Sequence, residues 1–239
     1  MNPFPVKAVL FDLDDTLWPI LPVIKQAEIV LHDWLALHAP RVVQQFSIEN
    51  LQTRRMEMMA AYPQFRTDLS ALRHAALSEA FMAAGDDPGK VDAAMAIFSR
   101  ARNAVTPFED VLPMLTRLST LVKVGSVSNG AADLDVIGLA QHFHVSIAAH
   151  QLGSAKPDAV IFHAACDALQ VRPAETVYVG DDPVADVEGA QKAGLCGIWL
   201  NRAELDPVRI LPPHIQPDAI FTTLYELDHW LAERIIEVT

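Results

Sequence analysis

The sequence predicts an α/β protein whose core is a parallel sheet covered by helices, with an all-helical domain inserted after the first strand. From residue 107 onward, short apolar runs alternate with helical stretches, the pattern of a parallel sheet buried on both faces. Between residues 23 and 104, no strand-like run interrupts the helical periodicity. A first apolar run at Val9–Phe11 is as apolar as the later ones, so we assign it to the same sheet.

The predicted first strand ends in an acidic segment. Asp12, Asp14 and Asp15 follow it, and Asp12 and Asp14 can project to the same side because strand side chains alternate. A buried carboxylate without a partner is costly, so such groups are paired, metal-bound or protonated. Aspartates are also frequent in the turns that follow strands. Taken alone, this segment fits a turn as well as it fits a hard-cation and acid/base site.

Three helices are expected in the all-helical segment, because residues 23–38, 67–84 and 91–98 carry apolar side chains at helical spacing. Proline-containing linkers at Pro19–Pro22 and Thr106–Pro107 bracket this segment. The predicted domains are a core made of residues 1–18 and 107–239 and a helical insertion made of residues 19–106.

The core is expected to continue as alternating helices and strands. The predicted helices are 111–118, 131–142, 158–169, 184–193 and 224–236, and the predicted strands are 121–127, 145–149, 176–180, 195–200 and 219–221. In parallel sheets of this kind, ligands bind at the carboxyl ends of the strands. The residues that follow each strand are therefore the candidates for a functional site.

A second acidic segment follows the predicted strand 176–180. This strand runs into Asp181 and Asp182, and Asp186 comes soon after them. A divalent metal bound by carboxylates from both strand ends is one explanation for the two segments together. The second segment therefore favours the metal interpretation of the first strand end over the turn interpretation.

Two further segments carry groups that suit an anion. Ser128, Asn129 and Gly130 follow an apolar strand and precede a predicted helix. There, a hydroxyl and backbone N–H groups form an anion site or, equally well, an N-cap and a glycine turn. Lys156 stands just before another predicted helix, where a lysine is unfavourable unless an anion is its partner. An ordinary surface lysine is the alternative.

Together and in this order, the four segments resemble the haloacid dehalogenase (HAD) superfamily of phosphohydrolases. Asp12–Thr16 matches the DxDx(T/V) signature, and Ser128 matches the short Ser/Thr motif. Lys156–Phe162 looks like the Lys-Pro motif, and Gly180–Asp186 matches the GDxxxxD motif. The resemblance spans about residues 6–236 and implies a Rossmann-like, three-layer core. The helical insertion after the first motif is similar to the C1-type cap of subfamily I.

This resemblance implies roles for the motif residues. Asp12 would attack the phosphorus and form an aspartyl-phosphate. Asp14 would protonate the leaving alcohol and then deprotonate the water that hydrolyses the intermediate. Lys156 would neutralise charge on Asp12 and on the phosphoryl group. The phosphoryl oxygens would be bound by Ser128, the N–H groups of Asn129 and Gly130, and Lys156.

The resemblance also implies Mg²⁺ as cofactor, an ion that prefers oxygen ligands and keeps several waters. Its ligands would be the Asp12 carboxylate, the Asp14 backbone carbonyl and Asp181. Asp186 would bind the ion through water or orient the motif lysine, and Asp182 is the alternative to Asp186 as a ligand.

Composition limits the partners of the chain. Its 239 residues carry a net charge of −12 with a pI near 5.1, which disfavours non-specific binding to nucleic acid or anionic membranes. No apolar run reaches the about 18 residues of a membrane-spanning helix, and no signal peptide is evident. Cys166 and Cys196 lie in apolar stretches and are expected to be buried thiols. We expect a cytoplasmic protein, monomeric or homodimeric, with no nucleic-acid or membrane partner.

The leading hypothesis is a Mg²⁺-dependent phosphatase that hydrolyses a small phosphorylated metabolite. Dehalogenases of the superfamily lack an acid at the position of Asp14, so carbon–halogen cleavage is not expected here. A sugar phosphomutase would keep both aspartates and stays an alternative. So does a non-catalytic, phosphate-binding regulatory protein with the same fold. The choice of substrate is expected to reside in the helical insertion.

Overall fold

The computed structural model describes residues 5–205 and 209–235. Within it, the chain forms two compact units, each with its own apolar core. The sheet unit comprises the chain up to Pro19, residues Thr106–Gly130 and the part from Gly138 onward, and the helical unit comprises Ile20–Val105 and Ala131–Ile137.

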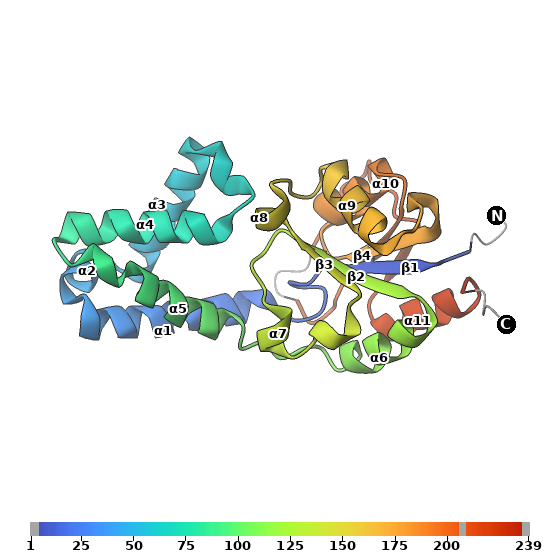
Figure 1. The fold of residues 1–239 in the computed structure, drawn as a ribbon, viewed down its shortest axis with the longest axis horizontal. Coiled ribbons are helices and arrows are strands. Elements are labelled where there is room, and N and C mark those ends of the chain that lie inside the picture. The colour runs from blue at the N-terminus through green and yellow to red at the C-terminus, as the bar shows by residue number, and fades with distance from the viewer. Residues whose placement is uncertain (1–4, 206–208, 236–239) are drawn as a thin grey trace. The chain divides into compact units, whose positions relative to one another are not determined.

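In the described part of the chain, the sheet unit contains one sheet of six parallel strands in the order β3-β2-β1-β4-β5-β6 (Figure 1). The strands are β1 Ala8–Phe11, β2 Lys123–Ser128, β3 Val145–Ala148, β4 Thr176–Gly180, β5 Cys196–Leu200 and β6 Ala219–Phe221. The chain runs outward from β1 to β2 and β3 and then returns to β4 beside β1, so the strand order reverses between β1 and β4. The predicted α/β fold with a parallel sheet is confirmed.

Helices cover both faces of this sheet. Those with bounds in the sheet unit are α6 Val111–Leu121, α8 Ala149–Leu152, α9 Ala159–Leu169, α10 Gly189–Lys192 and α11 Leu224–Ala232. Helices α9 and α10 lie on one face, and α6 and α11 lie on the other (Figure 1). On the α9 side, Leu10, Tyr178 and Phe162 belong to one fully buried cluster. The result is the three-layer arrangement expected for the core.

The helical unit has α1 Ile20–His38, α2 Pro40–Gln45, α3 Ile48–Ala61, α4 Leu69–Ala84, α5 Val91–Arg102 and the short α7 Leu134–Ile137. Its core contains Leu31 and Leu35 from α1, Phe81 from α4 and Phe98 from α5. Helix α1 begins before the expected residue 23 and includes Pro22 in its first turn, where the missing N–H of a proline has no intrahelical partner to lose.

The predicted helix 131–142 is wrong. Within this range the structure has only the four-residue helix α7, and a separate 3₁₀ turn covers Ala140–His142. The Asp133 carboxylate accepts the N–H groups of Asp135 and Val136, so the helix starts after it. Gly138, with φ of 83°, then ends it in the left-handed region. Only Ala131–Ile137 of this stretch belong to the helical unit, where the Asp133 N–H donates to Asn103 Oδ1 at 3.0 Å.

The predicted helix 184–193 is helical but begins as a π-helical turn, Pro183–Glu188, before α10. π-helical turns are rare in proteins, and those that do occur frequently lie at functional sites. Here the turn carries Asp186, whose side chain is buried. The predicted helix 224–236 ends at Ala232, and its last predicted residue lies outside the described residues.

Candidate active site

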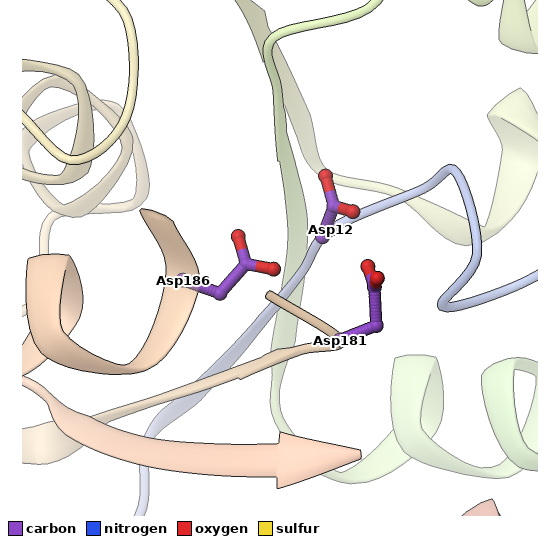
Figure 2. Close-up of side chains that lie close together, drawn as sticks. All are labelled: Asp12, Asp181 and Asp186. Atoms are coloured by element: carbon purple, nitrogen blue, oxygen red, sulfur yellow. The ribbon is translucent and has the colours of Figure 1, made fainter. Parts of the chain in front are cut away.

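Two of the predicted acidic residues follow neighbouring strands at the carboxyl edge of the sheet. Asp12 follows β1 and Asp181 follows β4, and the Asp12 N–H donates to the carbonyl of Val179 in β4 at 2.9 Å. They therefore stand where the strand order reverses, which is the usual ligand position in such sheets. Asp186 joins them from the π-helical turn, so that three carboxyl groups gather at this edge (Figure 2). One oxygen from each lies within 4.8 Å of the others, and all three residues are buried.

Lys156 closes this acidic cluster. Its Nζ donates to Asp12 Oδ1 at 2.5 Å, to Asp186 Oδ1 at 2.7 Å and to the Tyr178 hydroxyl at 2.9 Å. Burial opposes the charge of Lys156, but the carboxylates of Asp12 and Asp186 outweigh it and hold the lysine pKa well above its ordinary value. The surface alternative for Lys156 is therefore wrong, and the lysine is a buried ammonium between two motif aspartates.

Asp186 is held by partners on both of its carboxylate oxygens. Its Oδ1 receives Lys156, and its Oδ2 accepts the Asp182 N–H at 2.9 Å. Asp182 itself caps the π-helical turn, because its Oδ1 accepts the N–H groups of Val184 and Ala185, both at 2.9 Å. Within the three-carboxylate cluster, Asp186 therefore has the geometry that orients the lysine, and Asp182 is a capping residue outside the cluster.

The acidic cluster carries more negative charge than one lysine neutralises. Burial raises the pKa of Asp12 from 3.8 to about 7, although Lys156 pulls it down. Burial, together with the neighbouring Asp12 and Asp186 carboxylates, raises the pKa of Asp181 to about 9. Raised pKa values mean that the two groups tend to keep a proton unless another cation approaches. The cluster is thus electrostatically suited to a divalent ion.

Asp181 accepts a side-chain hydrogen bond on one of its two carboxylate oxygens. Thr16 Oγ1 donates to Asp181 Oδ1 at 3.2 Å, and Trp199 Nε1 donates to the Asp181 carbonyl at 2.8 Å. Asp181 Oδ2 is buried and accepts no hydrogen bond from the described residues, although the guanidinium of Arg209 lies beside it as an ion pair. A buried carboxylate oxygen without a hydrogen bond, next to other hard oxygen donors, fits Mg²⁺.

The loop after β1 holds the other aspartates of the first motif away from this cluster. Asp14 Oδ1 accepts the indole N–H of Trp18 at 2.9 Å, and its carboxyl group is not among the three that converge. Asp15 adopts a left-handed backbone with φ of 62°, a conformation that aspartates in turns tolerate. Arg202, almost fully buried, fastens this loop by donating from Nε and Nη2 to the Thr16 carbonyl at 3.1 and 3.0 Å.

The predicted phosphate-binding residues lie together at the end of β2. The Gly130 N–H donates to Ser128 Oγ at 3.0 Å. The Asn129 side chain forms a two-bond clamp on the backbone of Lys156: Oδ1 accepts its N–H at 2.8 Å, and Nδ2 donates to its carbonyl at 3.0 Å. The clamp joins the second and third motifs and gives the Asn129 side chain a role that the sequence does not predict.

Several site residues were missed because no pattern in the sequence marks them. Tyr178 and Trp199 lie in apolar strands, where an aromatic residue is expected for packing alone. Arg202 and Arg209 follow β5 without any recognisable motif. Their sequence has one feature in common, a side chain with a polar end group close to the end of a strand. This feature does not distinguish a residue of the site from a residue of the core.

Comparison with known proteins settles the family. The sequence profile of the haloacid dehalogenase-like hydrolases matches residues 6–194, which is more than half of the chain. The chain belongs to this family of hydrolases. The resemblance drawn from its motifs is thereby confirmed, and the protein is an enzyme of the family.

The similar proteins include named phosphatases and a named dehalogenase. Glyceraldehyde 3-phosphate phosphatase of Methanopyrus kandleri is 31% identical over 206 residues, covering 83% of this chain and 85% of that protein. The 5-amino-6-(5-phospho-D-ribitylamino)uracil phosphatase of Escherichia coli is 27% identical over 219 residues, covering 88% and 92%. The solved structure of a 2-haloacid dehalogenase from Pseudomonas syringae pv. Tomato DC3000 matches with a TM-score of 0.87 at 36% identity, covering 95% of this chain and 98% of that one.

The described helices include none that combines the length and the apolar character needed to cross a membrane.

Proposed function

We propose that this protein is a Mg²⁺-dependent phosphatase that hydrolyses a small phosphorylated metabolite through an aspartyl-phosphate on Asp12. The observation that carries the proposal is the buried group of Asp12, Asp181 and Asp186 around the Lys156 ammonium. Asp181 Oδ2 accepts no hydrogen bond from the described residues, and its partner is the Arg209 guanidinium. A carboxylate nucleophile beside a lysine and a hard-cation site suits phosphoryl transfer.

Mg²⁺ would be held by Asp12, the Asp14 carbonyl and Asp181, with Asp186 as a further or water-mediated partner, and would neutralise phosphoryl charge. In the first step a carboxylate oxygen of Asp12 forms a bond to phosphorus while the bond to the leaving oxygen breaks. Lys156 stays on Asp12 Oδ1 and balances the charge of the nucleophile and the phosphoryl oxygens. Ser128 and the Asn129 N–H would bind the remaining phosphoryl oxygens, joined by the Gly130 N–H once it exchanges its bond to Ser128 Oγ for one to the phosphoryl group.

Asp14 is the proposed acid and base. It gives its proton to the leaving oxygen and then takes a proton from the water that hydrolyses the aspartyl-phosphate. The Trp18 indole N–H fixes the orientation of its carboxyl group. An alkoxide is a strong base and leaves poorly without such a proton, so an acid at this position favours phosphate esters as substrates.

A 2-haloacid is the second candidate substrate, because the similar Pseudomonas syringae structure is named as a dehalogenase. A halide is a weak base and leaves without a proton, and its displacement from carbon adds no negative charge that a metal would neutralise. An acid at Asp14 would have no leaving group to protonate in that reaction, and a metal on Asp181 Oδ2, which accepts no hydrogen bond from the described residues, would have no charge to neutralise. These two groups are therefore our reason to prefer the phosphatase.

The class of substrate rests on the relatives, two of which are named for phosphorylated small molecules. We propose residues 1–18 and 107–239 as the catalytic core and residues 19–106 as a C1-type cap that selects the substrate. A sugar phosphomutase and a non-catalytic phosphate-binding protein stay as alternatives.

The deciding experiment measures phosphate release from an aryl phosphate and from a panel of phosphorylated metabolites, with and without Mg²⁺, beside halide release from 2-chloropropionate. We expect Mg²⁺-dependent phosphate release that disappears in Asp12→Asn and Asp181→Asn. Asp228→Asn, the same change at a surface ion pair with Arg117, should keep full activity. Halide release alone would establish the dehalogenase, sugar-phosphate isomers the mutase, and inactivity under every divalent metal the non-catalytic protein.

A further inference from the structure

Tyr178 places a hydroxyl group at the centre of the site, although it comes from an otherwise apolar strand. It lies in β4, opposite Leu10 of β1, and its side chain is fully buried. Its hydroxyl reaches past β1 and donates to the Val127 carbonyl of β2 at 2.9 Å. The same oxygen accepts Lys156 Nζ at 2.9 Å and lies 3.3 Å from Asp186 Oδ1. One hydroxyl therefore links the segments of the second, third and fourth motifs.

The contact with Tyr178 completes the coordination of the lysine. An ammonium group has three N–H donors, and here they go to Asp12, Asp186 and Tyr178. Two carboxylates fix two of the three directions, and the Tyr178 hydroxyl fixes the third. Burial holds the pKa of Tyr178 well above its ordinary value, so the hydroxyl stays neutral.

The tyrosine ring is itself fixed. Phe162, the last residue of the Lys-Pro motif, packs against it edge to face with ring centroids 4.9 Å apart and planes at 78°. Val127, whose carbonyl accepts the hydrogen bond of the Tyr178 hydroxyl, directly precedes Ser128. The Tyr178 hydroxyl, which accepts the hydrogen bond of Lys156, therefore cannot move unless β2 or α9 moves with it.

We propose that Tyr178 is a positioning residue that keeps the Lys156 ammonium in place through both half-reactions, an inference that rests on the proposed phosphatase function. When Asp12 becomes an aspartyl-phosphate, it loses the carboxylate charge that attracts the lysine. The partners that do not change charge at this step are Asp186 and Tyr178. Without the hydroxyl, Asp186 would be the one protein partner left of the three, and the ammonium would shift toward it and away from its place on the phosphoryl oxygens.

The test compares Tyr178→Phe with Thr176→Val. Both variants remove one buried hydroxyl from the same face of β4 and keep the bulk of the side chain. Thr176 Oγ1 donates to the Arg172 carbonyl at 3.0 Å and is not a partner of the lysine. For Tyr178→Phe we expect kcat to fall by about tenfold with KM changed by less than about twofold, because the lost hydrogen bond acts on a charged group during the chemical steps. Thr176→Val should leave both constants unchanged.

A second measurement reads the lysine directly and does not need activity. The side-chain nitrogen NMR signal of the buried Lys156 ammonium, assigned by its absence in Lys156→Met, should shift or broaden in Tyr178→Phe and stay in place in Thr176→Val. An unchanged ammonium signal in Tyr178→Phe, or equal losses of kcat in the two variants, would overturn the positioning role. If the native protein releases no phosphate, the phosphatase proposal fails, and the ammonium signal alone then decides whether Tyr178 positions the lysine.

Discussion

Gly180 lies directly against the carboxyl group of Asp186. A Cβ at position 180 would stand 2.3 Å from the carboxyl carbon of Asp186 and equally close to its Oδ2, a distance that real structures do not show. The glycine of the GDxxxxD motif therefore makes room for the aspartate of the same motif. This aspartate in turn accepts a hydrogen bond from Lys156, so the glycine protects the position of the lysine.

Gly180→Ala should displace Asp186 and separate it from Lys156. We expect at least a hundredfold loss of kcat, of the order seen when a charge-stabilising group is removed, and a loss of about 1–3 kcal/mol in the free energy of unfolding from overpacking. Gly138→Ala is the comparison, because its φ of 83° makes alanine cost about 1 kcal/mol without touching the site. Equal activity in the two variants would contradict the role of Gly180.

The metal-free protein should lose stability as the pH rises. The raised pKa values of Asp12 (about 7) and Asp181 (about 9) mean that the native state binds more protons than the unfolded chain above about pH 4. The free energy of unfolding should therefore fall from about pH 4 upward, with Asp12 contributing up to about pH 7 and Asp181 up to about pH 9, by at most about 1.4 kcal/mol per pH unit for each group. Denaturant unfolding in the presence of a chelator measures this slope.

Added Mg²⁺ should reverse that trend, because an ion that binds ionised carboxylates stabilises the native state at high pH. Asp181→Asn removes one of the two groups, so it should flatten the slope and abolish the response to Mg²⁺. A metal-free stability that increases from about pH 5 to about pH 9 would contradict the burial argument for both aspartates.

Arg209→Gln should strengthen Mg²⁺ binding. The guanidinium of Arg209 lies beside Asp181 and reaches Asp182 at 3.2 Å and Asp15 at 3.4 Å, so it competes with a metal for negative charge. Because 37% of the Arg209 side chain is exposed, solvent screens these pairs, and we expect a Kd lower by about two- to fivefold. Titration calorimetry of the metal-free protein measures it, with the exposed Arg172→Gln as control. Weaker binding in Arg209→Gln would show that the arginine supports the metal.

Trp18→Phe should impair proton transfer by Asp14. The variant removes the indole donor that holds Asp14 Oδ1 at 2.9 Å and keeps an aromatic ring in a fully buried position. General acid catalysis contributes about 10²–10⁴-fold, and it matters most for poor leaving groups. Activity on an alkyl phosphate should therefore fall by about tenfold or more, while activity on a nitrophenyl phosphate should change little. A uniform loss on both substrates would contradict the role of Trp18.

Arg202→Met should lower the free energy of unfolding more than the substitution of an exposed charged residue does. The guanidinium donates to Asp110 at 2.7 Å and to the Thr16 carbonyl, and both charged groups are almost fully buried. Removing one partner of a buried pair costs about 3–5 kcal/mol because the other charge is left uncompensated. Lys192→Met, in an exposed pair with Glu188, should cost less than about 1 kcal/mol in the same denaturant titration. Similar costs for both would show that Asp110 finds another partner.

Most of the sheet could be predicted from the sequence, because strands that are buried on both faces consist of short, continuous runs of apolar residues. The predicted run 176–180 corresponds residue for residue to β4. The helix expected over 131–142 failed because apolar spacing does not report on Gly138, whose left-handed backbone ends α7, or on the N-capping carboxylate of Asp133. In this segment, the local backbone conformation ended the helix although the apolar residues continue at helical spacing.

The sequence by itself determined the strand-end carboxylates, the motif lysine and the family, because these depend on residue types at fixed spacing along the chain. Tertiary structure alone decided that the third partner of Lys156 is Tyr178, that Asn129 clamps the lysine backbone, and that Arg209 pairs with Asp181. These contacts join residues that are 22 to 28 positions apart along the chain, or come from a loop without a motif. Strand order and side-chain length determine such distances, and neither is encoded in a local pattern.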